Sequence, residues 1–249
     1  MAGSAVRTSD GPPRHDRSPA KPGGRRARER ATLPVVDQPA PHAAVRRSYD
    51  AVAENYAASF ASELEGKPLD RALLASLLEQ AGPAARVADI GCGPGHVTSW
   101  LARRGAAAVG IDLSAGMVAV GRREHPEAEF RPGDFLALPA ADGEFSAVVA
   151  FYSLIHLEPG ELAPALREVR RVLAPGGAVL VSFHVGSDVV HRDEWLGQQV
   201  DVDFRFLEMA DVTAALEAAG LAVQMRLERA AYPGEVATTR GYVLARRPA

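Results

Sequence analysis

Three glycines at alternate positions form the stretch with the clearest chemical meaning in this chain. Residues 87–96 read Val-Ala-Asp-Ile-Gly-Cys-Gly-Pro-Gly-His, an apolar run that breaks into Gly91, Gly93 and Gly95. Glycine removes side chains where the backbone turns sharply and leaves its amides open to a ligand beside a helix N-terminus. Apolar residues at helical spacing follow, so the stretch predicts a strand, a tight turn and a helix that together bind a small polar ligand.

The spacing of these glycines differs from that of the dinucleotide fingerprint. That fingerprint requires Gly-x-Gly-x-x-Gly, whereas the third glycine here comes one residue early and position 96 is His. Because Asp89 lies inside the end of the strand, the full pattern is Asp-x-Gly-x-Gly-x-Gly. It resembles the first motif of the class I S-adenosylmethionine-dependent methyltransferases. The resemblance implies that Asp89 and the three glycines bind S-adenosylmethionine.

A second acid, Asp112, ends a short apolar strand 21 residues beyond Gly91. An acid at the tip of a second strand can accept hydrogen bonds from both hydroxyls of a ribose on the adjacent turn. We expect this role for Asp112, because Ser114 can cap the following helix in its place. Leu113 and Met117 would then pack around the adenine.

A third candidate acid follows the strand 129–131, in the run Pro132-Gly133-Asp134-Phe135. In the family that the chain resembles, a Gly-Asp pair here places its carboxylate against the adenine amino group and the next residue against the base. The resemblance implies these roles for Asp134 and Phe135, although Pro-Gly-Asp is also common in surface turns. We also assign Phe151, at the end of the apolar strand 146–151, to the cofactor site.

Two histidines lie where the central strands are expected to end. His156 follows the strand that ends at Phe151, and His184 ends the apolar strand 178–183. Ligands of open α/β sheets bind outside the carboxyl ends of the strands, so both imidazoles can approach a transferred methyl group. Histidine can take a proton from an acceptor near neutral pH. We expect His156 to be the better placed base, and a purely structural role is the alternative for each.

Two amphipathic helices, 45–60 and 68–80, are expected before the first strand, because their apolar residues recur at three and four. The segment Tyr49-Asp50-x-x-Ala53-x-x-Tyr56 resembles the N-terminal cap that many small-molecule methyltransferases fold over the cofactor. The resemblance implies that Tyr49 and Tyr56 face a ligand. Plain helix packing is the alternative for both tyrosines.

The later segments alternate between strands and helices and resemble the same family over residues 45–246. The resemblance implies an α/β fold, a Rossmann-like seven-stranded mostly parallel sheet with helices on both faces and an N-terminal helical cap. The strands 221–229 and 241–246 would form the C-terminal antiparallel hairpin. A helix is expected over 159–173 and another over 210–219.

Residues 185–203 are expected to form a long loop between the fifth strand and the next helix. Ordered loops of this length are usually functional, so we expect this one to close over the methyl acceptor with Trp195 as an apolar anchor. No metal site is expected, because no metal-ligand spacing relates His184, His191, Asp193 and Glu194.

Composition separates a basic N-terminal tail from an acidic body. Residues 1–47 hold ten Arg or Lys against four Asp or Glu, although the chain of 249 residues carries a net charge of −3. We expect residues 1–42 to be disordered and 43–249 to form one domain. A nucleic-acid or partner-binding arm is the alternative for the tail, while the acidic body disfavours nucleic acid as the acceptor.

The remaining composition excludes several classes of protein. The single cysteine, Cys92, cannot form an intramolecular disulfide. No apolar run approaches the ~20 residues of a membrane span, and no signal peptide is recognisable, so we expect a cytoplasmic protein. The oligomeric state, monomer or dimer, stays open.

The sequence thus predicts methyl transfer from S-adenosylmethionine to an O, N or C nucleophile of a small or medium-sized molecule, by in-line displacement. The protein would align the acceptor, exclude water and accept a proton where needed. Two alternatives stay open, a Rossmann-type NAD(P)-dependent oxidoreductase and a non-catalytic S-adenosylmethionine-binding protein.

Overall fold

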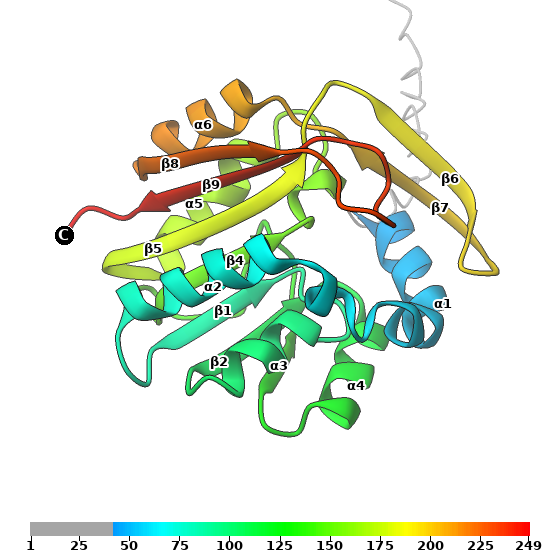
Figure 1. Cartoon of the computed structure of the whole chain (residues 1–249), viewed down its shortest axis with the longest axis horizontal. Helices are drawn as coiled ribbons and strands as arrows, with labels where there is room; N and C mark the ends of the chain where they lie inside the picture. Colours follow the sequence, from blue (N-terminus) through cyan, green and yellow to red (C-terminus); the bar gives the residue numbers. More distant parts are fainter. Residues whose placement is uncertain (1–41) are drawn as a thin grey trace, which may run out of the picture. The chain divides into compact units, whose positions relative to one another are not determined.

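The computed structural model describes residues 42–249, so the predicted disorder of residues 1–42 lies outside it, apart from His42. The main sheet has seven strands, namely β1 (Arg86–Ile90), β2 (Ala107–Asp112), β3 (Glu129–Pro132), β4 (Phe145–Phe151), β5 (Leu173–His184), β8 (Ala222–Arg229) and β9 (Arg240–Arg246). Their spatial order is β3-β2-β1-β4-β5-β9-β8 (Figure 1). Strand β9 runs antiparallel to both β5 and β8, and the other pairs are parallel. The predicted sheet with its C-terminal antiparallel hairpin is confirmed.

The helices are α1 (Ala43–Phe60), η1 (Glu63–Gly66), α2 (Pro68–Ala81), α3 (His96–Ala102), α4 (Ala115–Glu124), η2 (Leu154–His156), α5 (Leu162–Val172) and α6 (Met209–Ala218). Helices α2 and α3 cover one face of the sheet, and α5 and α6 cover the other. No described helix is long and apolar enough to cross a membrane.

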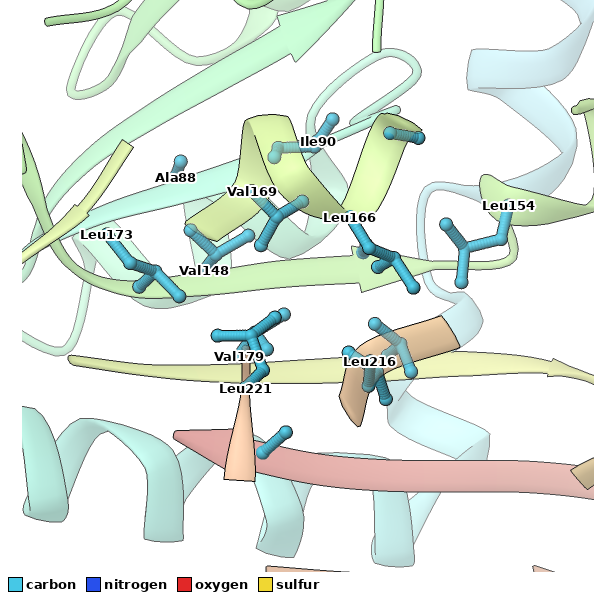
Figure 2. Packing of buried hydrophobic residues seen from close by; sticks show 14 of the residues in the cluster. Ala88, Ile90, Val148, Leu154, Leu166, Val169, Leu173, Val179, Leu216 and Leu221 are labelled. Atoms are coloured by element: carbon cyan, nitrogen blue, oxygen red, sulfur yellow. The ribbon is translucent and has the colours of Figure 1, made fainter. Parts of the chain in front are cut away.

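Alternation along the central strands places apolar side chains against both helical layers. In β1, Val87 packs on the side of α2 and α3, whereas Ala88 and Ile90 pack on the side of α5 and α6. Figure 2 shows the hydrophobic cluster on the side of α5 and α6, where Leu166 of α5 and Leu216 of α6 lie close to the strands. Because helices cover both faces of the sheet, the carboxyl ends of the parallel strands are the part of the sheet that stays open to a ligand.

Helix α1 is held over this edge by contacts with α4. The Asp50 Oδ1 atom accepts a hydrogen bond from the Ser114 hydroxyl at 2.6 Å and another from the Gly116 N–H at 2.9 Å. Ser114 also caps α4 as predicted, because its Oγ accepts from the Met117 N–H at 3.0 Å. The side chain of Met117 is fully buried between α1 and α4, where it packs against Val52.

The expected loop over residues 185–203 is wrong, because this segment forms an antiparallel hairpin of β6 (Val189–Trp195) and β7 (Gln198–Arg205). Figure 1 shows the hairpin beside α1, apart from the main sheet. The turn residues Leu196 and Gly197 have φ values of 51° and 74°. Two residues with positive φ are characteristic of a type I′ hairpin turn, but leucine in the first position hides this signal in the sequence.

Candidate functional site

One cavity of about 710 Å³ lies where the strands of the main sheet end, under α1 and the β6–β7 hairpin. It brings together residues from the whole described chain, including most of the site residues predicted from the sequence. The predicted residues that line it are Tyr49, Tyr56, Asp89, Gly91, Gly93, Asp112, Leu113, Asp134, Phe135, Phe151, His156 and His184. Gly95 and Met117 do not line the cavity, and their assignment to cofactor binding stays a prediction.

The glycine turn after β1 requires glycine for two different reasons. At Gly91, φ is +71° and a Cβ atom would lie only 2.2 Å from the Ser153 Cβ atom, so a side chain would push the turn away from the end of β4. At Gly95, φ is +93° and a Cβ atom would lie 2.5 Å from the Phe130 ring. Gly91 therefore shapes the cavity wall, whereas Gly95 allows α3 to pack on β3.

Asp112 joins the glycine turn to the start of α4. Its Oδ2 atom accepts a hydrogen bond from the Gly93 N–H and its Oδ1 atom accepts one from the Ser114 N–H, both at 2.8 Å. Burial raises the pKa of Asp112 to about 6, although these two backbone donors favour the charged form. A carboxylate offers about four acceptor positions, so two remain for a ligand in the cavity.

Asp89 has a similar environment with a different partner. Its Oδ2 atom accepts a hydrogen bond from the Thr98 hydroxyl at 2.7 Å, which links the end of β1 to α3. Burial also raises the pKa of Asp89 to about 6. One buried carboxylate, Asp112, thus binds the glycine turn, and the other, Asp89, binds the helix that follows the turn.

Polar groups that the sequence analysis did not select lie beside this turn. Lys67 donates to Glu63 Oε1 at 2.6 Å, and the other oxygen of Glu63 lies 3.3 Å from His96 Nε2. The His96 Nδ1 and Ser153 Oγ atoms are buried and have no hydrogen-bond partner within residues 42–249. All four side chains line the cavity, which offers a cation, an anion and unused polar atoms to a polar ligand.

Asp134 lies at another wall of the cavity and contacts the first residue of the described chain. Its Oδ2 atom lies 3.2 Å from His42 Nδ1, and His42 Nε2 lies 2.9 Å from Glu161 Oε2. Burial alone would lower the pKa of His42, but the hydrogen bonds to Glu161 and Asp134 raise it overall. His42, predicted as the end of the tail, is therefore held between two carboxylates of the domain.

The outer part of the cavity, which we call the aromatic half, consists of Tyr49, Tyr56, His156, Trp195 and Phe204. The Trp195 ring makes edge-to-face contacts with Tyr49, Tyr56 and Phe204, at centroid distances of 5.6, 5.5 and 5.3 Å. Edge-to-face pairs of this kind are stabilising, and these rings give this part of the cavity an aromatic lining. Trp195 was predicted as an apolar anchor, and the hairpin positions it against α1.

His156 is fixed in one tautomer by its two hydrogen bonds. Its Nδ1 atom lies 2.9 Å from the backbone carbonyl oxygen of Asp203, which can only accept, so Nδ1 carries the proton. The Nε2 atom lies 2.6 Å from the Tyr49 hydroxyl and therefore accepts its proton. Burial lowers the pKa of His156 to about 4, which keeps the imidazole neutral at physiological pH.

His184 lines the same cavity but is held differently. Its Nδ1 atom lies 2.7 Å from the Thr238 hydroxyl, and its ring stacks on Phe206 at 5.3 Å. Burial, with the charges of Arg240 and Lys67, lowers the pKa of His184 to about 4. No three His, Cys, Asp or Glu side chains gather in a metal-binding arrangement within residues 42–249.

Comparison with known proteins shows which methyltransferases the chain is similar to. The model of a family described as a methyltransferase domain matches residues 87–177. The demethylmenaquinone methyltransferase of Beutenbergia cavernae is 35% identical over 136 residues, which cover 54% of this chain and 55% of that protein. The malonyl-[acyl-carrier protein] O-methyltransferase of Halorhodospira halophila is 36% identical over 190 residues, which cover 71% of this chain and 60% of that protein. The chain thus spans less than two thirds of either relative.

A solved structure agrees with these matches at the level of the fold. The 1,6-didemethyltoxoflavin-N1-methyltransferase of Burkholderia thailandensis, with its bound substrate and S-adenosylhomocysteine, superposes with a TM-score of 0.65 at 19% identity. The match covers 86% of this chain and 94% of that one. Residues 87–177 thus match a methyltransferase domain, and the described chain shares the Rossmann-like fold of methyltransferase structures, one of which holds S-adenosylhomocysteine. The matches count against the dinucleotide-binding alternative.

Proposed function

We propose that the chain transfers the methyl group of S-adenosylmethionine to an O, N or C nucleophile of a small or medium-sized molecule, by in-line displacement. The observation that carries this proposal is the continuity of the cavity. Asp112 and the glycine turn line it together with the Tyr49–His156 pair. A cofactor and an acceptor bound in one cavity can be aligned with each other.

The polar side of the cavity fits the cofactor. Asp112 would accept from the ribose, while Asp134 and Phe135 would face the adenine. The unused polar atoms of His96 and Ser153 would bind the amino-acid end. When bound, S-adenosylmethionine supplies a methyl group on a sulfonium, which is already a good leaving group.

The Tyr49–His156 pair is our candidate for handling the acceptor's proton. The free lone pairs of the Tyr49 oxygen can accept a proton from an acceptor hydroxyl or amine while its own proton passes to His156 Nε2. The Asp203 carbonyl oxygen would favour the resulting imidazolium, because it accepts from Nδ1 throughout. His184 lacks such a relay, and we propose that it shapes the pocket through its stacking on Phe206.

The relatives' names support a small acceptor, since they refer to demethylmenaquinone and to a malonyl group on a carrier protein. The acidic body outside the tail agrees, because a nucleic-acid acceptor would call for a basic surface. A cytoplasmic location stays part of the proposal.

Isothermal titration tests the cofactor side of the proposal. The full chain should bind S-adenosylmethionine and S-adenosylhomocysteine at one site and show no comparable affinity for NAD(P). Binding of NAD(P) without binding of S-adenosylmethionine would overturn the proposal. Binding of S-adenosylmethionine without any turnover would instead support the non-catalytic alternative.

A further inference from the structure

Four Lys or Arg side chains of the described chain line the cavity, and two of them are neutralised within it. Lys67 lies 2.6 Å from Glu63 Oε1, and Arg240 lies 3.8 Å from Glu235 Oε2. Both pairs lie on the side of η1 and β9. The other two, Arg46 of α1 and Arg192 of β6, line the same cavity and form no ion pair with any residue of 42–249.

Arg46 is the more enclosed of these two arginines. It is half-buried, and its Nε atom is buried without a hydrogen-bond partner within residues 42–249. An unpaired guanidinium N–H away from water costs free energy. The carboxylates of Asp134 and Glu161 bind His42, the N-cap residue one turn before Arg46, and form no ion pair with Arg46. Within residues 42–249, the Nε donor of Arg46 is therefore unused, and the side chain lines the cavity.

Arg46 lies on the same side of α1 as Tyr49. Arg46 and Tyr49 are three residues apart on α1, and both line the cavity. Side chains at this spacing are neighbours on a helix face, with Cβ atoms about 5 to 6 Å apart. An anion bound by the guanidinium would therefore lie in the same cavity as the Tyr49–His156 pair. The Trp195 ring contacts Tyr49, and the Phe204 ring contacts His156.

We propose, on the basis of the proposed function, that the methyl acceptor is a planar aromatic carboxylate. Its carboxylate binds the Arg46 guanidinium, its ring lies in the aromatic half, and its nucleophile lies toward the Tyr49 hydroxyl. Arginine suits this role because its planar fork matches the two oxygens of a carboxylate. Arg192, which is exposed at the rim, adds positive charge that attracts the same group.

A pair of matched probes tests the charge preference. 4-Hydroxybenzoate and 4-hydroxybenzamide share one shape and differ in charge at neutral pH. Each is titrated into the full chain saturated with S-adenosylhomocysteine, in a Trp100→Phe background. The chain has two tryptophans, so Trp195 in the aromatic half then reports binding. Trp100 lies outside the cavity, with Arg104 stacked 3.5 Å above its ring.

We expect 4-hydroxybenzoate to bind at least about tenfold more tightly than the amide, and Arg46→Gln to remove this difference. Arg46→Lys should restore part of it, because the charge is kept. Arg47→Gln, on the exposed side of the same helix, is the matched control and should leave the preference unchanged. Equal binding of the two probes, or a preference that survives in Arg46→Gln, would overturn the inference. Failure to bind S-adenosylhomocysteine would count against the proposed function instead.

Discussion

The Tyr49 hydroxyl of α1 donates to His156 Nε2 of η2 at 2.6 Å, although the two residues are 107 positions apart in the chain. The contact joins the N-terminal cap to the end of β4, across the cavity from the glycine turn. Within residues 42–249, neither the Tyr49 hydroxyl oxygen nor His156 Nε2 forms a second hydrogen bond. The pair therefore has free acceptor capacity on the tyrosine oxygen, where an acceptor can bind.

Replacing His156 tests the relay. We expect His156→Ala to lower kcat by about a hundredfold, because a positioned base contributes roughly 10² to 10⁴. S-adenosylmethionine affinity from isothermal titration should change little. Tyr49→Phe, which removes only the hydroxyl, should lower kcat by a similar factor. If His156→Ala and Trp195→Ala both keep full turnover and acceptor affinity, the acceptor binds elsewhere.

Removing the carboxylate of Asp112 should weaken cofactor binding about tenfold to over a hundredfold, since hydrogen bonds to a charged acceptor contribute roughly 1.5 to 3 kcal/mol. Asp112→Ala also leaves the Gly93 and Ser114 N–H groups without their partner. A lower melting temperature should therefore accompany the loss. Asp112→Asn, which keeps one acceptor oxygen, separates the two effects. Unchanged affinity in Asp112→Ala would remove this residue from the cofactor site.

The pKa of His156 predicts a dependence of stability on pH. Its folded value of about 4 lies below the unfolded value of about 6.5, so the folded state resists protonation. The stability that this residue contributes is present above pH 6.5 and is lost as the pH falls from about 6.5 to about 4. Denaturant unfolding across this range should show a smaller loss in His156→Gln than in the wild type. Parallel curves for the two proteins would show that His156 titrates normally.

The parts of the site that follow from local pattern were predictable, and those that depend on tertiary packing were not. A glycine turn and an acid at a strand end identify Gly91 and Asp112, because parallel strands bring their carboxyl ends to one edge. In the sequence, Arg46 reads as an ordinary helix residue and Lys67 as an ordinary residue before a helix. Their roles depend on whether each side chain forms an ion pair with a carboxylate from another segment, and this depends on the fold.

The hairpin illustrates the same limit at the level of an element. Val200, Val202 and Phe204 alternate with polar residues in the sequence, which is a strand signal. The partner strand shows no such alternation, and the turn lacks the usual Asn-Gly or Asp-Gly signal. The hairpin is held by packing on α1 and by the Ser48 hydroxyl, which accepts from the Asp201 N–H at 2.9 Å. These contacts cross about 150 positions of the chain.

The N-terminal tail should be dispensable for catalysis on a small acceptor. We expect deletion of residues 1–41 to change neither the melting temperature nor kcat, because the tail has no core-forming pattern. Deleting 1–42 is the matched comparison, since it also removes the contacts of His42 with Asp134 and Glu161. Only the longer deletion should lower the melting temperature. A large drop in the shorter deletion would show that the tail contributes to the domain.

The most direct test of the account is the transfer of a labelled methyl group. The full chain is incubated with methyl-labelled S-adenosylmethionine and a pool of small metabolites that includes aromatic carboxylates, and the products are separated by mass. We expect label to appear in a small molecule, and we expect His156→Ala to form about a hundredfold less labelled product than the unchanged protein. A protein that binds S-adenosylmethionine but transfers no label to any small molecule would contradict it.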